Sequence, residues 1–498
     1  MNVNPITRLD YPDPDVIRVE DTYYMVSTTM HFMPGCEILQ SFDLVHWEHV
    51  TYVYETLDHT DAQQLKSGQN IYGQGMWAAS LRYHEGRFYI CFVANDTRKT
   101  YLYTSEKIDG PWKKQLIEGF YHDGSLLFDE DGRNYIVYGN DEIWITELNE
   151  DLTAPKKDGL HRLLVSDHKN PELGYEGSHI QKINGYYYIF LVHSLRDRWM
   201  RTEACFYSDS LEGEFTGGDV LCDDRGYCGQ GVAQGGIVDT PDGKWYAMLF
   251  QDSGAVGRLP ILLPVIWKDH FPVFGQNGHV PEEIEVHSTR PGYIYQPLVG
   301  SDDFCNGLLP RWQFNHDPDP QYYHLDALQG TYTITTREVC TELTQAVNTL
   351  TQRMSYPSCA AEVTVDASAL KDGDVAGLCA FQGCYAAVGI TKHHGKYEVL
   401  MLDKKEDGIL DMTEGTVVES HQMDFRLEAD FCNMKDEARC YYRVNKGDWL
   451  PIGTVHKLYF KLDHFTGCRF GLFCYAAEET GGSACFRDFK YYDVDEIS

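Results

Sequence analysis

Basic residues are scarce in this chain of 498 residues. It has 42 Lys and Arg against 75 Asp and Glu, which gives a formal net charge of −33 at pH 7. A surface of that sign repels nucleic acid and anionic membranes, so the sequence predicts neither as a partner. It favours neutral or cationic partners, and it also keeps a large protein soluble, which requires no partner.

Long apolar runs are missing too. No segment approaches the roughly 18 apolar residues that a membrane span requires, and no basic stretch followed by an apolar run opens the sequence. The 15 cysteines form no CxxC pair and no Cys/His metal spacing, and most lie in strand-like runs such as YICFVA around Cys91. That pattern is typical of buried, reduced thiols. We therefore expect a protein of a reducing compartment, the cytoplasm, with no membrane attachment.

Helical periodicity is also absent, and a short β-type repeat is present instead. The repeat joins a turn residue, an aromatic residue and an apolar strand, as in EDTYYMV, EGRFYICF, DGRNYIVY, NGYYYIFL and DGKWYAML. Its anchoring tyrosines are Tyr24, Tyr89, Tyr135, Tyr188 and Tyr246. Asp-Gly and Asn-Gly before a β-rich run indicate hairpins. Five such units predict an all-β chain that begins with a five-bladed β-propeller of four-stranded blades.

The repeat also predicts a ring of side chains around the propeller axis. Eleven residues before the first anchor, or twelve before each later one, stand Asp13, Trp77, Asp123, Glu176 and Gln234. Equivalent positions of successive blades surround one mouth of the channel, so these residues predict a polar pocket with one aromatic wall. Asp13 lies between Pro12 and Pro14, which stiffen the backbone and favour a preorganised acid–base group.

These segments resemble glycoside hydrolase family 43, of the α-L-arabinofuranosidase and β-xylosidase type. The resemblance lies in the segments NPITRLDYPDPDVIRVEDTYYMV, YGQGMWAASLRYHEGRFYI, YHDGSLLFDEDGRNYIVYG, GYEGSHIQKINGYYYIF and QGGIVDTPDGKWYAMLFQ. It implies a propeller that hydrolyses α-L-arabinofuranosides and β-D-xylosides with inversion. It makes Asp13 the general base, Glu176 the general acid, and Asp123 the carboxylate that tunes and orients the acid.

The resemblance implies further substrate-binding residues and no required cofactor. His31 and Phe32, in TTMHFMPG, resemble the pocket-lining segment of the family, and Arg258, in GAVGRLP, resembles the basic residue that contacts the terminal sugar. Trp77 is placed to stack on the sugar, and Gln234 shares its ring phase. Ala233 stands where many members carry an axial His near a bound cation, which weakens the expectation of an axial metal.

Inverting hydrolysis sets the protonation states that these acids need. The two carboxyl groups must lie roughly 6.5–9.5 Å apart, with a water between the base and the sugar. We expect Asp13 to be ionised and Glu176 to be protonated near neutral pH. A neighbouring negative charge on Asp123 would favour that protonated form.

The second half predicts a separate domain. We expect the propeller to span residues 1–290, a linker 291–302, and a β-sandwich of concanavalin or jelly-roll type 303–498, since strands there alternate with turns such as VNKGDW. The resemblance implies that a loop of the sandwich caps the pocket and restricts it to chain ends; a sandwich that binds sugar itself is the alternative. Asp302, Asp303 and Asp488 are weak candidates for a structural calcium site.

Together these features predict an exo-acting inverting glycosidase that releases terminal α-L-arabinofuranosyl residues from arabinoxylan-derived oligosaccharides. A β-D-xylosidase, or a bifunctional enzyme on the same scaffold, is the alternative. A non-catalytic carbohydrate-binding propeller is a second alternative, which the three carboxylates in phase argue against. A small oligosaccharide is thus the expected partner, and the sequence is compatible with a homo-oligomer.

Overall fold

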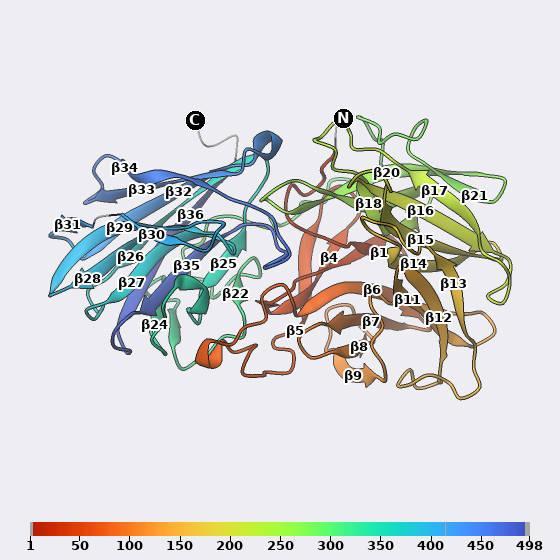
Figure 1. Cartoon of the computed structure of the whole chain (residues 1–498), viewed down its shortest axis with the longest axis horizontal. Coiled ribbons are helices and arrows are strands. Elements are labelled where there is room, and N and C mark those ends of the chain that lie inside the picture. Colours follow the sequence, from red (N-terminus) through yellow and green to blue (C-terminus); the bar gives the residue numbers. More distant parts are fainter. Residues whose placement is uncertain (1–2, 414, 494–498) are drawn as a thin grey trace.

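The computed structural model describes residues 3–413 and 415–493, and the outer ends of the two predicted domains, residues 1–2 and 494–498, lie outside the described residues. Two β-rich lobes lie side by side, with the N-terminal half in red to green and the C-terminal half in cyan to blue (Figure 1). The described helices are three short 3-10 turns, η1 (Lys66–Gly68), η2 (Leu343–Gln345) and η3 (Cys432–Met434). None of the described helices is long and apolar enough to cross a membrane.

The first lobe consists of five four-stranded antiparallel sheets, which confirms the predicted propeller. Blade 1 contains β1 (Asp15–Val19), β2 (Thr22–Ser27), β4 (Gly35–Ser41) and β5 (Glu48–Tyr54). Blade 2 contains β6 (Met76–His84), β7 (Arg87–Ala94), β8 (Lys99–Ser105) and β9 (Lys113–Ile117). Blade 3 contains β10 (Ser125–Phe128), β11 (Asn134–Asn140), β12 (Glu142–Leu148) and β13 (His161–Ser166). Blade 4 contains β14 (Glu176–Ile183), β15 (Tyr186–Ser194), β16 (Arg201–Ser208) and β17 (Thr216–Leu221). Blade 5 contains β18 (Val232–Asp239), β19 (Trp245–Asp252), β20 (Arg258–Lys268) and β21 (Phe271–Phe274).

The first strands of the blades face the axis, and the repeat tyrosines lie on the second strands. The inner strands β1, β6, β10, β14 and β18 pack against one another in this order, and β18 packs against β1 to complete the circle. The N-terminal segment stabilises this closed circle through two hydrogen bonds to β20. Ile6 N donates to Pro260 O (3.0 Å), and the Asn4 side chain donates to Leu262 O (2.7 Å).

A buried polar network crosses the channel between the inner strands. Asp15 is fully buried and accepts hydrogen bonds from Arg82 Nη1 (2.8 Å) and Leu81 N (2.7 Å), and His179 Nδ1 lies 3.1 Å from its other oxygen. Arg82 also donates to Ser125 Oγ (2.7 Å). Because buried charges require such partners, the network ties four blades together and fills the channel behind the predicted ring.

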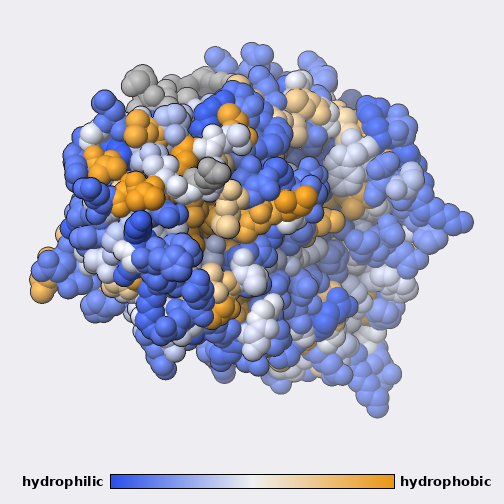
Figure 2. Space-filling view, turned by 60° about the vertical axis from the view of Figure 1, so that its left-hand side comes forward, coloured by the Kyte–Doolittle hydropathy of each residue, from blue (hydrophilic) through white to orange (hydrophobic). Residues whose placement is uncertain are grey.

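The second lobe is a sandwich of two antiparallel sheets. One sheet has the order β3 (Phe32–Met33), β22 (Gln313–Asn315), β25 (Leu350–Arg353), β35 (Arg469–Ala476), β27 (Asp374–Phe381), β28 (Ala386–His393), β29 (Lys396–Lys404) and β30 (Leu410–Met412), with β31 (Thr416–Val418) also paired to β29. The other has the order β23 (Tyr323–Asp326), β24 (Thr331–Thr335), β36 (Ser483–Asp493), β26 (Ser358–Asp366), β32 (Gln422–Asp430), β33 (Glu437–Val444) and β34 (Leu450–Lys457). A core that includes Leu378, Phe425, Phe470 and Phe486 fills the space between them. The outer face that Figure 2 turns forward is mostly hydrophilic, with apolar residues in small groups.

One propeller strand belongs to the sandwich. The two-residue strand β3 leaves blade 1 and pairs with β22, so that Phe32 and Met33 face Asn315 and Phe314. The Arg469 guanidinium lies 3.5 Å from the centre of the Phe32 ring, and Phe32 packs into a sandwich cluster with Leu343 and Tyr385. This shared sheet joins the two lobes through backbone hydrogen bonds as well as side-chain packing.

Candidate active site

The predicted ring positions lie where the inner strands begin. Asp13 and Asp123 each stand two residues before an inner strand, Glu176 is the first residue of β14, and Trp77 and Gln234 lie near the starts of β6 and β18. Asp13, Asp123 and Gln234 have positive φ angles of 52°, 47° and 63°. Such left-handed backbone is unfavourable for residues with a side chain and is concentrated at functional sites. Its recurrence in three blades shows that these positions share one local geometry.

Asp13 is held by two side chains. Thr28 Oγ1 donates to Asp13 Oδ2 (2.6 Å), and Arg258 Nη1 donates to Asp13 Oδ1 (3.0 Å). Arg258 is 2% exposed, and its guanidinium lies 4.2 Å from the centre of the Phe465 ring of the sandwich. Arg258, predicted to contact the terminal sugar, thus binds the Asp13 carboxylate and a sandwich ring. The hydrogen bonds from Thr28 and Arg258 fix the orientation of the Asp13 carboxylate.

Asp123 is buried beside two other acids. Burial, reinforced by the charges of Glu176 and Asp13, raises the pKa of Asp123 to about 6, although His122 acts in the opposite direction. Gly177 N donates to Asp123 Oδ2 (3.0 Å), which ties Asp123 to the residue after Glu176. Gly177 has a φ of 67°, and a Cβ there would lie 2.8 Å from Gln234 Cγ, so this turn requires glycine. Gln234 therefore supports the turn from behind.

Glu176 faces a cavity and has two polar neighbours. Asn140 Nδ2 donates to Glu176 Oε2 (2.6 Å), and His122 Nε2 lies 3.5 Å from the same oxygen. His122 Nε2 is also 3.5 Å from Asp123 Oδ2. The Asp123 charge, with further contributions from Glu176 and Asp13, raises the pKa of His122 to about 9.

The same three residues form the one metal-like cluster of the described chain. Donor atoms of His122, Asp123 and Glu176 all lie within 4.8 Å of one another. With a pKa of about 9, however, His122 carries a proton on both ring nitrogens at neutral pH and has no lone pair to offer. A metal ion at this cluster would therefore have to displace the proton on His122 Nε2. Among the described residues, the calcium candidates Asp302, Asp303 and Asp488 do not form such a cluster. Asp302 accepts a hydrogen bond from Trp312 Nε1 (2.8 Å) and Asp303 one from Cys305 N (3.0 Å).

Both lobes line the cavity that Glu176 faces. Its volume is about 680 Å³. The propeller contributes Trp77, Arg98, Phe120, His122, Trp199 and Arg201, among others. The sandwich contributes Met434, Phe460, Lys461, Leu462 and Phe465. The Phe465 ring centre lies 5.7 Å from that of Trp77, so aromatic walls from two lobes meet above the acids. The sandwich therefore covers this mouth of the propeller, as the capping prediction requires.

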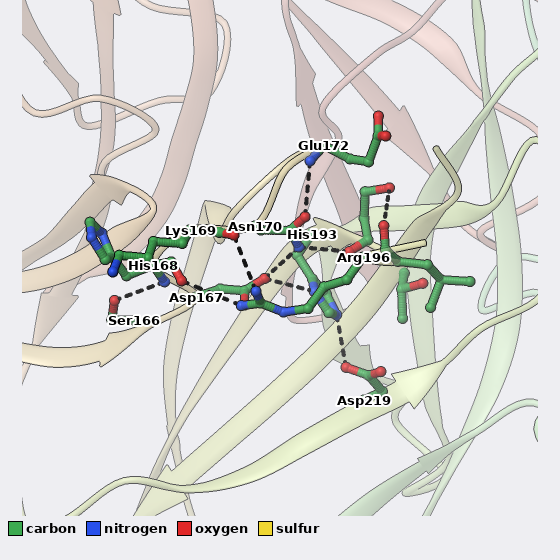
Figure 3. Close-up of polar contacts among 12 residues, drawn as sticks. Ser166, Asp167, His168, Lys169, Asn170, Glu172, His193, Arg196 and Asp219 are labelled. Carbon is green, nitrogen blue, oxygen red and sulfur yellow. Dashed lines mark hydrogen bonds and ion pairs between the residues drawn. The ribbon is translucent and has the colours of Figure 1, made fainter. Parts of the chain in front are cut away.

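A polar cluster outside the cavity fixes one of its walls (Figure 3). Asp167 accepts hydrogen bonds from Asn170 Nδ2 (2.7 Å) and from Arg196, and His193 bridges Asp167 and Asp219 at 3.1 and 2.8 Å. Burial alone would lower the pKa of His193, but its bonds to Asp219 and Asp167 raise it. The cluster fastens the loop that carries Glu172 and Leu173 and the turn that carries Trp199, all of which line the cavity.

Two predicted pocket residues lie elsewhere. His31 and Phe32 are fully buried at the junction of the lobes, where His31 packs against Tyr72, His316 and His464 at ring-centre distances of 4.8, 5.0 and 5.6 Å. Neither residue lines the cavity. Of the other predicted residues, Trp77 and Glu176 line the cavity. Asp13, Asp123, Gln234 and Arg258 are buried close to them and are not part of its lining.

Several cavity residues carry no signal in the repeat. His122, Asn140, Trp199 and Arg201 lie at strand ends or in turns outside the phase of the predicted ring. His122 directly precedes Asp123, so its proximity to one ring acid could have been read from the sequence. Its proximity to Glu176 could not have been read there, because that contact depends on the packing of blades 3 and 4.

Comparisons with known proteins agree with this geometry. Residues 3–272 match the family model "Glycosyl hydrolases family 43", and residues 301–492 match "Beta xylosidase C-terminal Concanavalin A-like domain". A β-xylosidase from Formosa agariphila is 26% identical and aligns over 99% of this chain and 89% of its own.

Two solved structures share the whole two-lobed architecture. A bifunctional GH43-CE protein from Bacteroides eggerthii is 42% identical with a TM-score of 0.92, and the match covers 99% of this chain but 64% of that longer one. The second is an engineered GH43 glycoside hydrolase described as displaying both endo-xylanase and exo-arabinofuranosidase activity. It is 27% identical with a TM-score of 0.86, and the match covers 99% of each chain.

Proposed function

Because the chain belongs to glycosyl hydrolase family 43, we propose that it is an exo-acting inverting enzyme that releases terminal α-L-arabinofuranosyl residues from arabinoxylan-derived oligosaccharides. The observation that carries the proposal is the convergence of Asp13, Asp123 and Glu176. Each of these acids affects the charge state of its neighbours at one end of the propeller channel. A binding site for neutral sugar alone would not need three acids close enough to act on one another's charge.

The contacts of each carboxylate suit a different role. Asp13, bonded to Arg258 and Thr28, is the general base that takes a proton from the attacking water. Glu176, at the cavity wall, is the general acid that protonates the departing glycosidic oxygen. Asp123, buried behind them and tied through Gly177 N to the residue after Glu176, is the acid that tunes and orients the proton donor.

The cover over the cavity supports an exo mode of action. Phe460, Leu462 and Phe465 of the sandwich cover part of the propeller mouth and line a cavity of about 680 Å³ together with propeller residues. A cover on one side of the acids leaves less room for a polymer that extends in both directions, which favours binding of a chain end. Trp77 offers the apolar face on which a pentose stacks.

β-D-Xylosidase activity is the competing function, favoured by the description of the matching C-terminal family model and of the Formosa relative. The deciding experiment compares kcat/KM for nitrophenyl α-L-arabinofuranoside and nitrophenyl β-D-xyloside, and then for arabinosylated and plain xylo-oligosaccharides. We expect the arabinosides to be preferred. A preference for xylosides would show that the proposed substrate class is wrong while leaving the proposed hydrolytic chemistry in place. Binding of both substrates without hydrolysis would refute the proposal that the protein is an enzyme.

We also propose that the enzyme acts in the cytoplasm on imported oligosaccharides. All 15 cysteines are free thiols and most are buried, which suits a reducing compartment. Cell fractionation with activity assays tests this, and activity confined to the culture medium would contradict it.

A further inference from the structure

His122 occupies a position between two of the three acids. It precedes Asp123 in the turn that leads into β10, and its carbonyl accepts a hydrogen bond from Gly139 N (3.0 Å) on β11. Its Nε2 is 3.5 Å from Asp123 Oδ2 and 3.5 Å from Glu176 Oε2. The ring centre lies 5.8 Å from that of Trp77, and the side chain is 20% exposed toward the cavity.

The other charged groups around the cavity have different partners. Arg258 is paired with Asp13 at 3.0 Å, and the guanidinium of Arg98 lies 3.9 Å from the centre of the Phe120 ring. Arg201 is paired with Asp252 at 2.9 Å, and the charges of Glu176 and Asp13 also act on it. Within the described part of the chain, His122 is the one basic side chain with a nitrogen within 4.0 Å of Asp123 or Glu176. Its positive charge therefore offsets the repulsion between these two carboxylates.

We propose that His122 is the positioning cation of the acid pair: its imidazolium holds Glu176 beside Asp123 and sets the upper pH limit of the reaction. The inference rests on the proposed glycosidase function. A cation between two carboxylates favours their ionised forms, so it limits how far into the alkaline range the acid keeps its proton. The Asp123 charge, with Glu176 and Asp13, raises the pKa of His122 to about 9, so the imidazole is charged through the neutral range.

The first test compares pH profiles of kcat/KM for two variants of this residue. His122→Gln removes the charge, and we expect the alkaline limb to move to higher pH by about 1 to 3 units. His122→Lys keeps a cation, and its limb should lie closer to that of the wild type. Asp123→Asn removes the neighbouring negative charge and should move the limb in the opposite direction.

The matched control is His46→Gln. His46 also pairs with an aspartate, Asp43, at 2.8 Å, but it lies on an exposed turn of blade 1 outside the cavity. Its profile should coincide with that of the wild type. An alkaline limb that is the same in His122→Gln and the wild type would overturn the proposal, as would equal displacement in the Gln and Lys variants.

A second test needs no catalysis. In protein labelled with ¹³C-histidine, the resonance that disappears in folded His122→Gln identifies His122, and its titration should have a midpoint near pH 9 that falls in Asp123→Asn. A midpoint at the ordinary value near 6.5 would overturn the proposal. A wild-type enzyme that hydrolyses no pentoside while His122 titrates near 9 would instead refute the proposed function.

Discussion

At the scale of single residues, the three acids differ in what holds them. Asp13 has a guanidinium and a hydroxyl, Asp123 has a backbone N–H, and Glu176 has an amide at the cavity wall. His122 lies 3.5 Å from both Asp123 and Glu176. The acid paired with a guanidinium is thus the proposed base, and the one that faces the substrate space is the proposed proton donor. Identical chemical groups acquire separate roles from their surroundings.

Replacing either proposed catalytic carboxylate should be costly. We expect Asp13→Asn and Glu176→Gln to lower kcat on oligosaccharides by about 10² or more, because each removes proton transfer in the transition state. Glu176→Gln should lose less on nitrophenyl glycosides, whose leaving group departs without protonation. Steady-state kinetics on both substrate types check this, with Asp43→Asn as a control outside the cavity. Near-normal turnover of oligosaccharides by either variant would remove that residue from the mechanism.

The repeat in the sequence located the acids but not their neighbours. Asp13, Asp123 and Glu176 share one phase because equivalent blade positions surround one axis, and this regularity is written in local sequence. Asn140 reaches Glu176 from the end of β11, outside that phase. Its role follows from the packing of two blades, which no local pattern encodes.

At the scale of elements, the turns between strands decide the shape of the cavity. The loop after β13 and the turn between β15 and β16 contribute Leu173 and Trp199, and the cluster around Asp167 holds both (Figure 3). The segment at β3 shows the limit of sequence reasoning at this scale. Its pairing with β22 joins residues about 280 positions apart, so Phe32 is buried between the lobes instead of lining the cavity.

Loosening the Asp167 cluster should weaken substrate binding. Asp167→Ala removes the acceptor for Arg196, Asn170 and His193, so we expect KM to rise several-fold with a smaller change in kcat. Amide exchange in residues 167–175 should quicken at the same time, which mass spectrometry detects. Asp151→Ala, in an exposed turn of blade 3, is the control. An unchanged KM together with unchanged exchange would show that the cluster does not position this wall.

At the scale of the whole molecule, the two lobes behave as one folded unit. Asp10 of the propeller accepts hydrogen bonds from Arg258 N and Gly467 N, both at 2.7 Å, and Arg353 of the sandwich pairs with Glu37 of blade 1 at 2.8 Å. The sequence predicted two domains and their fold classes. It did not predict this interface, because buried pairs between distant segments have no periodic signature.

Mild acid should destabilise the junction of the lobes. Burial lowers the pKa of His464 to about 4 and holds those of His31 and His316 well below the ordinary value of 6.5. A base whose pKa is lowered by folding contributes its full stability above 6.5 and loses it as the pH falls toward the folded value. For His464 alone the loss between pH 6.5 and 4 is about 3 kcal/mol.

Calorimetric unfolding at several pH values measures this effect. We expect the Tm of the wild type to fall steeply below pH 6.5 and that of His464→Phe to fall less, since Phe preserves the stacking on Tyr72 without a group to protonate. Equal pH dependence in the two proteins would contradict the role of the buried imidazole.

The central claim is that three acids at one end of a capped propeller hydrolyse pentosides with inversion. Following the reaction on nitrophenyl α-L-arabinofuranoside by proton NMR tests it most directly, because the anomer released first reports the chemistry before mutarotation. The account predicts that β-L-arabinofuranose appears first. First release of the α anomer, or no release of arabinose or xylose from any pentoside, would contradict it.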